Sequence, residues 1–84
     1  MSNLFNGNDI ILNKEKIVNA LVSQKSSLTI DYAKIKYFAE AFIKEAGNKG
    51  SISKFNIGPI VRKTCSKCGI LGNDPNIIEK IFKG

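Results

Sequence analysis

The sequence predicts an all-α fold, a small compact bundle of about four helices. Apolar residues recur at spacings of three and four in separate segments, which is the period of a helix with one buried face. Glycine and proline fall between these segments, and no repeat or linker divides the chain. With 84 residues, 43% of them hydrophobic, the chain has room for one core. We therefore expect residues 1–84 to form a single small basic domain, with a flexible N-terminal segment over residues 1–9.

The first two helices are predicted from caps and apolar stripes. The first covers residues 13–24, where Asn13 suits the N-cap and one stripe follows: Ile17, Val18, Leu21 and Val22. The second has Thr29 as a candidate N-cap, Asp31 in the first turn and Gly47 at its end. Its pattern is the strongest in the chain, with apolar residues at Ile35, Phe38, Ala39, Phe42, Ile43 and Ala46.

Two further helices are predicted to begin at proline. Pro59 follows Gly58 and suits the first helical position, because its missing amide hydrogen would be unpaired there. Gly69 ends this third helix. The pair Asp74-Pro75 repeats the start signal for a last helix, whose apolar edge consists of Ile77, Ile78, Ile81 and Phe82.

Two short segments have ambiguous patterns. Residues 51–57 alternate polar and apolar side chains, which predicts a strand, but Ser53 could equally cap one helical turn. Residues 9–12 could form another extended piece. Because no clear second strand accompanies them, we favour the all-helical fold, and the alternative is a winged helix with a short β-hairpin.

Few residues in the chain could carry catalysis or hold a metal ion. There is no histidine, which removes the commonest general base near neutral pH and the ordinary Ser-His and Cys-His nucleophiles. Two cysteines cannot complete a four-ligand zinc site within one chain. We therefore expect no catalytic activity, no metal site of the chain's own and no cofactor.

Signals for export and for membrane insertion are also missing. The longest aliphatic run, residues 10–12, is far shorter than a membrane span, and the N-terminus lacks a positive cluster followed by an apolar stretch. The sequence therefore predicts a soluble intracellular protein, in the cytoplasm or nucleus, with no membrane partner.

The positive charge of the chain is concentrated in one window. Residues 49–68 contain five basic and no acidic residues, whereas the other segments are close to neutral. Within the predicted third helix, Arg62, Lys63, Ser66 and Lys67 share one face, and small apolar side chains share another. The third helix is therefore predicted to have a basic side.

A basic helix of this kind is typical of nucleic-acid binding, because each cation that reaches a phosphate releases counterions from the polyanion. The short capped segment before Gly58-Pro59 gives the outline of a helix-turn-helix. We predict a non-catalytic module that binds nucleic acid, duplex DNA rather than RNA, through residues 59–68. The candidate contacts are Lys49, Lys54, Arg62, Lys63, Ser66 and Lys67.

Other interpretations of the same residues stay open. The cations could be ordinary solvated lysines, or the basic face of a protein-interaction module or inhibitor, for example phage- or plasmid-encoded, that binds an acidic partner. A homodimer or a small protein partner is compatible with the thin stability margin of so short a chain. A pull-down of the protein from its native lysate, before and after nuclease treatment, would separate the nucleic-acid-binding module from the inhibitor, because a partner retained after digestion would favour the inhibitor.

The cysteines and aromatic residues are predicted mainly to fill the core. Cys65 and Cys68 have the spacing of a redox motif or half of a zinc knuckle, but they fall inside a helix, so burial is favoured over redox chemistry or a metal site shared between copies. Most phenylalanines belong to apolar stripes. Phe55, between Lys54 and Asn56, is the one expected to be free for contact.

Parts of the chain resemble the centromere protein X type of histone-fold protein. Residues 12–21, LNKEKIVNAL, resemble its first helix, residues 28–31 its loop, residues 42–46 its central helix, and residues 77–82 its last helix. This covers about half of the chain. The resemblance implies a small subunit that pairs with a histone-fold partner on duplex DNA. Gly47, Gly50 and Gly58-Pro59 fall where that family has one long continuous helix.

Overall fold

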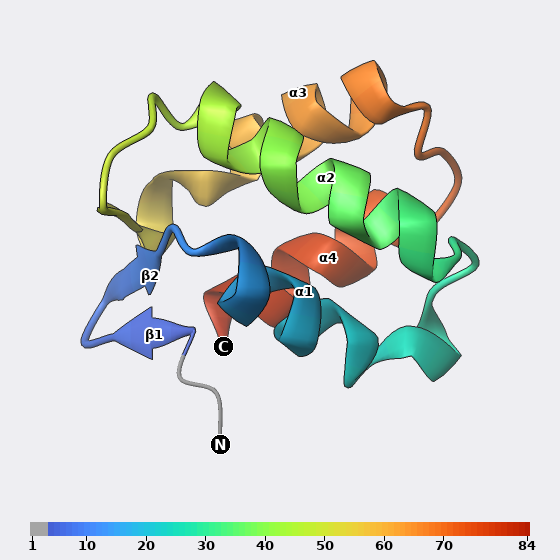
Figure 1. Cartoon of the computed structure of the whole chain (residues 1–84), viewed down its shortest axis with the longest axis horizontal. Helices are drawn as coiled ribbons and strands as arrows, with labels where there is room; N and C mark the ends of the chain where they lie inside the picture. Colours follow the sequence, from blue (N-terminus) through green and yellow to red (C-terminus); the bar gives the residue numbers. More distant parts are fainter. Residues whose placement is uncertain (1–3) are drawn as a thin grey trace.

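Four helices and a small antiparallel sheet make up residues 4–84, the part of the chain that the computed structural model describes (Figure 1). The strands are β1 (Phe5–Asn6), β2 (Asp9–Ile11) and β3 (Ser51–Ser53), and the helices are α1 (Lys14–Val22), α2 (Tyr32–Glu45), α3 (Ile57–Cys68) and α4 (Asp74–Lys83). Two short 3₁₀ turns, η1 (Lys25–Ser27) and η2 (Lys54–Asn56), complete the order. The prediction of four helices is confirmed.

The three-stranded sheet corrects the all-helical prediction. Strands β1 and β2 form a hairpin around Gly7, whose φ of 63° suits the first position of a type II′ turn. Strand β3 then pairs with β2, placing Ile52 opposite Ile10. The sequence pattern indicated extended structure near β2 and β3 but left the sheet as an alternative, because strands of two and three residues give too short a pattern to decide between strand and turn.

The N-terminal segment takes part in the fold. In the stretch predicted to be flexible, residues 1–9, Leu4 is buried and Phe5 begins β1, while residues 1–3 lie outside the described residues. Both ambiguous segments are also resolved. Residues 9–11 form β2, and residues 51–57 contain a strand followed by the turn η2, which Ser53 caps by accepting a hydrogen bond from the Phe55 amide.

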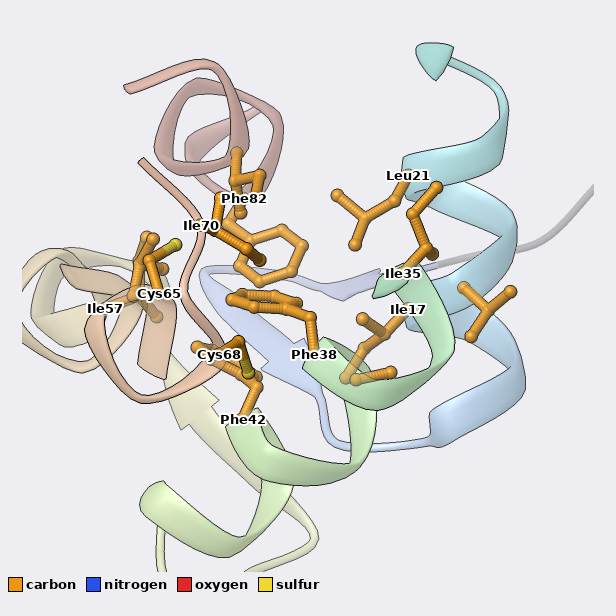
Figure 2. Close-up of a cluster of buried hydrophobic side chains, with 14 of the residues drawn as sticks. Ile17, Leu21, Ile35, Phe38, Phe42, Ile57, Cys65, Cys68, Ile70 and Phe82 are labelled. Carbon is orange, nitrogen blue, oxygen red and sulfur yellow. The ribbon is translucent and has the colours of Figure 1, made fainter. Parts of the chain in front are cut away.

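The core lies where the four helices meet. Phe38, Phe42 and Phe82 are fully buried, and the Phe82 ring centroid lies 4.9 Å from that of Phe42 and 6.2 Å from that of Phe38. Figure 2 shows Phe38 and Phe82 at the centre, with Cys65 and Cys68 of α3 reaching inward beside them. These rings hold α4 against α2.

Several predicted helix ends are confirmed, whereas α1 ends at Val22 rather than at residue 24, and the predicted cap of α2 is wrong. Asn13 caps α1 by accepting a hydrogen bond from the Lys16 amide, and Gly47 and Gly69 follow α2 and α3 with positive φ. The cap of α2 is Asp31, which accepts from the Lys34 amide. Thr29 instead donates its amide and its hydroxyl to the buried Asp74 carboxylate, which ties the start of α4 to the segment that precedes α2.

The connection between α2 and α3 distinguishes this fold from a compact helix-turn-helix. Residues 46–56 separate the two helices and contain β3 and η2, whereas a helix-turn-helix has a turn of three or four residues. Helix α3 begins at Ile57, two residues before the predicted start at Pro59. Helix α2 has 14 residues and ends at Glu45, so the chain does not continue here as the long central helix that the histone-fold resemblance implies.

Candidate nucleic-acid interface

Helix α3 packs against both α2 and α4 (Figure 1). Val61, Thr64, Cys65 and Cys68 face the core, as the sequence predicts. The residues that remain exposed form what we call the α3 ridge: Pro59, Arg62, Lys63, Ser66 and Lys67. The predicted separation of a basic from an apolar side is therefore confirmed.

On one flank of the ridge, two lysines share a single carboxylate of α2. The Nζ of Lys67 lies 2.7 Å from Oε1 of Glu45, and the Nζ of Lys63 lies 3.0 Å from its Oε2. The Glu45 side chain is 15% exposed, whereas those of Lys63 and Lys67 are 65% and 59% exposed. The carboxylate is therefore recessed beneath the two ammonium groups.

The other flank repeats this arrangement with α4. Nη1 of Arg62 lies 3.1 Å from Oε1 of Glu79, and Nζ of Lys83 lies 2.8 Å from its Oε2. Glu79 is 18% exposed, while Arg62 and Lys83 are 61% and 52% exposed. We refer to both flanks together as the basic cluster: Arg62, Lys63, Lys67 and Lys83 with Glu45 and Glu79.

The charge count along the chain overstates the charge of this surface. The window of residues 49–68 holds no acidic residue, but Glu45 and Glu79 enter from the neighbouring helices, so Arg62, Lys63 and Lys67 all form ion pairs. The basic cluster contains four cations and two carboxylates, which leaves a surplus of two positive charges. The ridge is therefore a partly neutralised basic surface rather than a row of unpaired cations.

The ion pairs keep both carboxylates charged at neutral pH. Hydrogen bonds from Lys67 and Lys63 lower the pKa of Glu45 below its ordinary value, although burial opposes them. The hydrogen bond from Lys83 lowers the pKa of Glu79 in the same way. Glu45 pairs with two lysines of α3, and Glu79 pairs with Arg62 of α3 and Lys83 of α4, which reduces the entropy lost when those side chains bind an anion.

Sequence analysis missed Glu45, Glu79 and Lys83 as members of this site. Glu79 and Lys83 have the spacing of an intrahelical ion pair, which is visible in the sequence. The contacts of Glu45 with Lys63 and Lys67 join residues about 20 positions apart, and only the packing of α2 on α3 brings them together.

The remaining predicted contacts are placed differently. Ser66 lies on the α3 ridge among the cations, while Lys49 lies exposed in the connection between α2 and β3. Lys54 belongs to η2, where its Nζ lies 5.9 Å from the centroid of the Phe5 ring and 5.8 Å from that of Phe55. The structure therefore brings together four of the six predicted contacts on the ridge, and Lys54 sits in a separate group with two aromatic rings.

The cysteine pair is buried and reduced, as the favoured interpretation predicts. Burial raises the pKa of Cys65 to about 12, with smaller contributions from Cys68 and Asp74, and burial also raises that of Cys68. Both thiols are therefore protonated at neutral pH and are poor nucleophiles. Within residues 4–84, no group of three or more His, Cys, Asp or Glu residues is arranged to hold a metal ion.

Comparisons of the chain with protein-family models, with curated proteins and with solved structures give no match. Among the described helices, none combines the length and the apolar character that crossing a membrane requires. The α3 ridge and the residues beside it are therefore the basis for a functional proposal.

Proposed function

We propose that this protein is a non-catalytic nucleic-acid-binding module whose α3 ridge contacts the phosphates of duplex DNA. The observation that carries the proposal is the difference in exposure between the cations and the carboxylates of the basic cluster. Its four cations are 52–65% exposed, whereas its two carboxylates are 15–18% exposed. An approaching phosphate therefore meets the cations before it meets the carboxylates.

Phosphate binding at this ridge follows from general electrostatics. Each cation that reaches a phosphate releases condensed counterions, so binding strengthens with the number of contacts and weakens steeply with salt. Arg62 can donate more than one hydrogen bond to a phosphate, and the Ser66 hydroxyl lies between the cations as a neutral donor. These groups supply affinity for the backbone rather than for a base sequence.

The test is the affinity for a DNA duplex of the charge-reversed variant Lys63→Glu with Lys67→Glu, measured by fluorescence anisotropy at two salt concentrations. We expect the native protein to lose affinity steeply with salt, and the variant to bind much more weakly. Loss of two phosphate contacts lowers the slope of log affinity against log salt by about 2. The control is Lys16→Glu with Lys25→Glu, which makes the same change of charge on the α1 side of the molecule.

Two outcomes would overturn the proposal. If the native protein fails to bind the duplex at low salt, the ridge is not a nucleic-acid interface. If both double variants lose the same affinity, only total charge matters and the ridge has no special role. A partner that stays bound to the protein in native lysate after nuclease digestion would instead favour an acidic protein as the ligand.

A further inference from the structure

Phe55 is the most exposed phenylalanine among the described residues. It is 71% exposed, whereas Phe38, Phe42 and Phe82 are fully buried. It belongs to η2, directly before α3 begins. A phenylalanine left in water at the edge of a basic surface has no stabilising role in the core, and its ring is available to a ligand.

The backbone at Phe55 is held by two hydrogen bonds, donated by the amides of Lys54 and Phe55. The amide of Lys54 donates to the Asn8 carbonyl at 2.8 Å, which ties η2 to the β1–β2 turn. The amide of Phe55 donates to Oγ of Ser53 at 3.2 Å. The turn that carries the ring is therefore ordered before a ligand binds, so that binding to the ring costs little backbone entropy.

A cation accompanies the ring. The Nζ of Lys54 lies near the Phe55 ring and near the Phe5 ring of β1, at almost equal distances from the two centroids. This arrangement combines a flat apolar surface with a positive charge. A nucleotide presents the matching pair of groups, since its base has a π-face and its phosphate is an anion.

This aromatic group adjoins the basic cluster through the end of α4. A Cβ placed on Gly84 would lie 3.8 Å from Nζ of Lys54 and 3.9 Å from the Phe5 ring. The preceding residue is Lys83, which shares Glu79 with Arg62. Figure 1 shows the end of α4 beside the β1–β2 hairpin. The end of α4 therefore connects the basic cluster with Lys54, whose ammonium group lies near the Phe55 ring.

From this juxtaposition we propose that Phe55 is a stacking site for an unpaired base of a nucleic-acid strand, with Lys54 and Lys83 binding the adjoining phosphates. The inference rests on the proposed function and narrows its ligand to a duplex with a single-stranded extension. Stacking suits an isolated exposed ring, because every base offers a π-face and no particular sequence is needed.

The first experiment places a fluorophore at the site. The chain contains no tryptophan, so Phe55→Trp introduces a single one. Three probes are compared: a blunt duplex, the same duplex with a thymine overhang, and the same duplex with an abasic overhang. We expect quenching of the tryptophan only with the thymine overhang, because only that probe supplies an unpaired base to stack. Tyr37→Trp, at a 56% exposed position on α2, is the control and should show no quenching.

The second experiment measures affinity for the same probes with Phe55→Leu, which keeps an apolar side chain but removes the π-face. The native protein should bind the thymine overhang more tightly than the abasic one, by about 5- to 150-fold. Phe55→Leu should remove this difference and leave the affinity for the blunt duplex unchanged, while Phe55→Trp should retain it.

The outcomes separate the two proposals. If the native protein binds the blunt duplex but does not distinguish the two overhangs, the stacking site is wrong and the phosphate interface stands. If Phe55→Leu and the native protein prefer the thymine overhang equally, another residue reads the base and Phe55 does not stack. If the native protein binds none of the probes, the proposed function itself fails.

Discussion

Two lysine-bearing surfaces of this protein differ in how their charges are paired. On the α1–α2 side, Lys14 forms an ion pair with Glu40, one cation to one carboxylate, and the two side chains are 44% and 57% exposed. On the α3 side, each carboxylate serves two cations and lies deeper than either of them. The Glu40 carboxylate has one cation in ion-pair contact, with Lys36 and Lys44 acting on it from farther away, whereas Glu45 and Glu79 each have two cations in direct contact.

This difference shows that lysine content alone does not define an anion-binding surface. Both sides of the molecule are rich in lysine, and both contain ion pairs with lowered carboxylate pKa values. The number of cations per carboxylate and the depth of the carboxylate decide what an approaching phosphate meets. The comparison between the two surfaces can be tested by removing either the packing that creates it or the carboxylates themselves.

The largest effect is expected from Phe82→Ala, which removes the ring that packs α4 against α2. The side chain is fully buried, so its truncation should lower the free energy of unfolding by about 3–5 kcal/mol. Because α4 carries Glu79 and Lys83, loosening of α4 should also disrupt the flank of the basic cluster that these two residues form with Arg62. Urea denaturation followed by circular dichroism measures this change.

The matched control is Phe55→Ala, the same substitution at an exposed ring. Its effect on the free energy of unfolding should stay within about 0.5 kcal/mol, as is usual for surface positions. Equal losses in the two variants would contradict the placement of Phe82 in the core. They would also remove the basis for describing Phe55 as free for contact.

Local signals in the sequence predicted much of the helical fold. The apolar stripe of α2, the cap at Asn13 and the glycines after α2 and α3 each act within a few residues, so the sequence shows them directly. The cap at Asp31 was misassigned to Thr29, because Thr29 is used by Asp74 from a distant helix. Both residues are suitable N-caps for α2, and the tertiary contact of Thr29 with Asp74 decides which of them takes that role.

For the candidate site, the sequence predicted the cations of α3 but not the carboxylates with which they form ion pairs. The helical period placed Arg62, Lys63, Ser66 and Lys67 on one face, and the structure confirms that face. Their carboxylate partners come from helices whose orientation no local pattern specifies. The sheet was not favoured for a similar reason, since the alternation of residues 51–57 does not specify β2 as the strand with which β3 pairs.

The comparison is sharpened by removing one carboxylate from each surface. Glu45→Gln leaves Lys63 and Lys67 without their shared anion, so affinity for duplex DNA should rise about fivefold at low salt. Glu40→Gln changes the net charge equally but frees only Lys14, on the other surface, and should change the affinity by less than about twofold. Anisotropy titrations at one fixed salt concentration measure both variants.

The ranking of these two variants matters more than the absolute gain. A weaker affinity for Glu45→Gln would mean that the carboxylate is needed to position the two lysines rather than competing with the phosphate. An equal gain for both variants would mean that phosphate binding follows net charge, and the difference between the two surfaces would then have no functional meaning.

The smallest effect is expected on the free energy of unfolding at acidic pH. Because ion pairs lower the pKa of Glu45 and Glu79 below the ordinary value of 4.5, their contribution to stability is fully present above that pH and is lost as the pH falls through it toward the lowered pKa values. The free energy of unfolding should therefore decline below pH 4.5, and Glu45→Gln should make this decline shallower. Glu40→Gln should flatten it less, since Glu40 has one ion-paired cation where Glu45 has two. Urea denaturation across this acidic range measures how the free energy of unfolding changes with pH. Equal flattening in the two variants would show that sharing a carboxylate between two cations does not stabilise the folded state further.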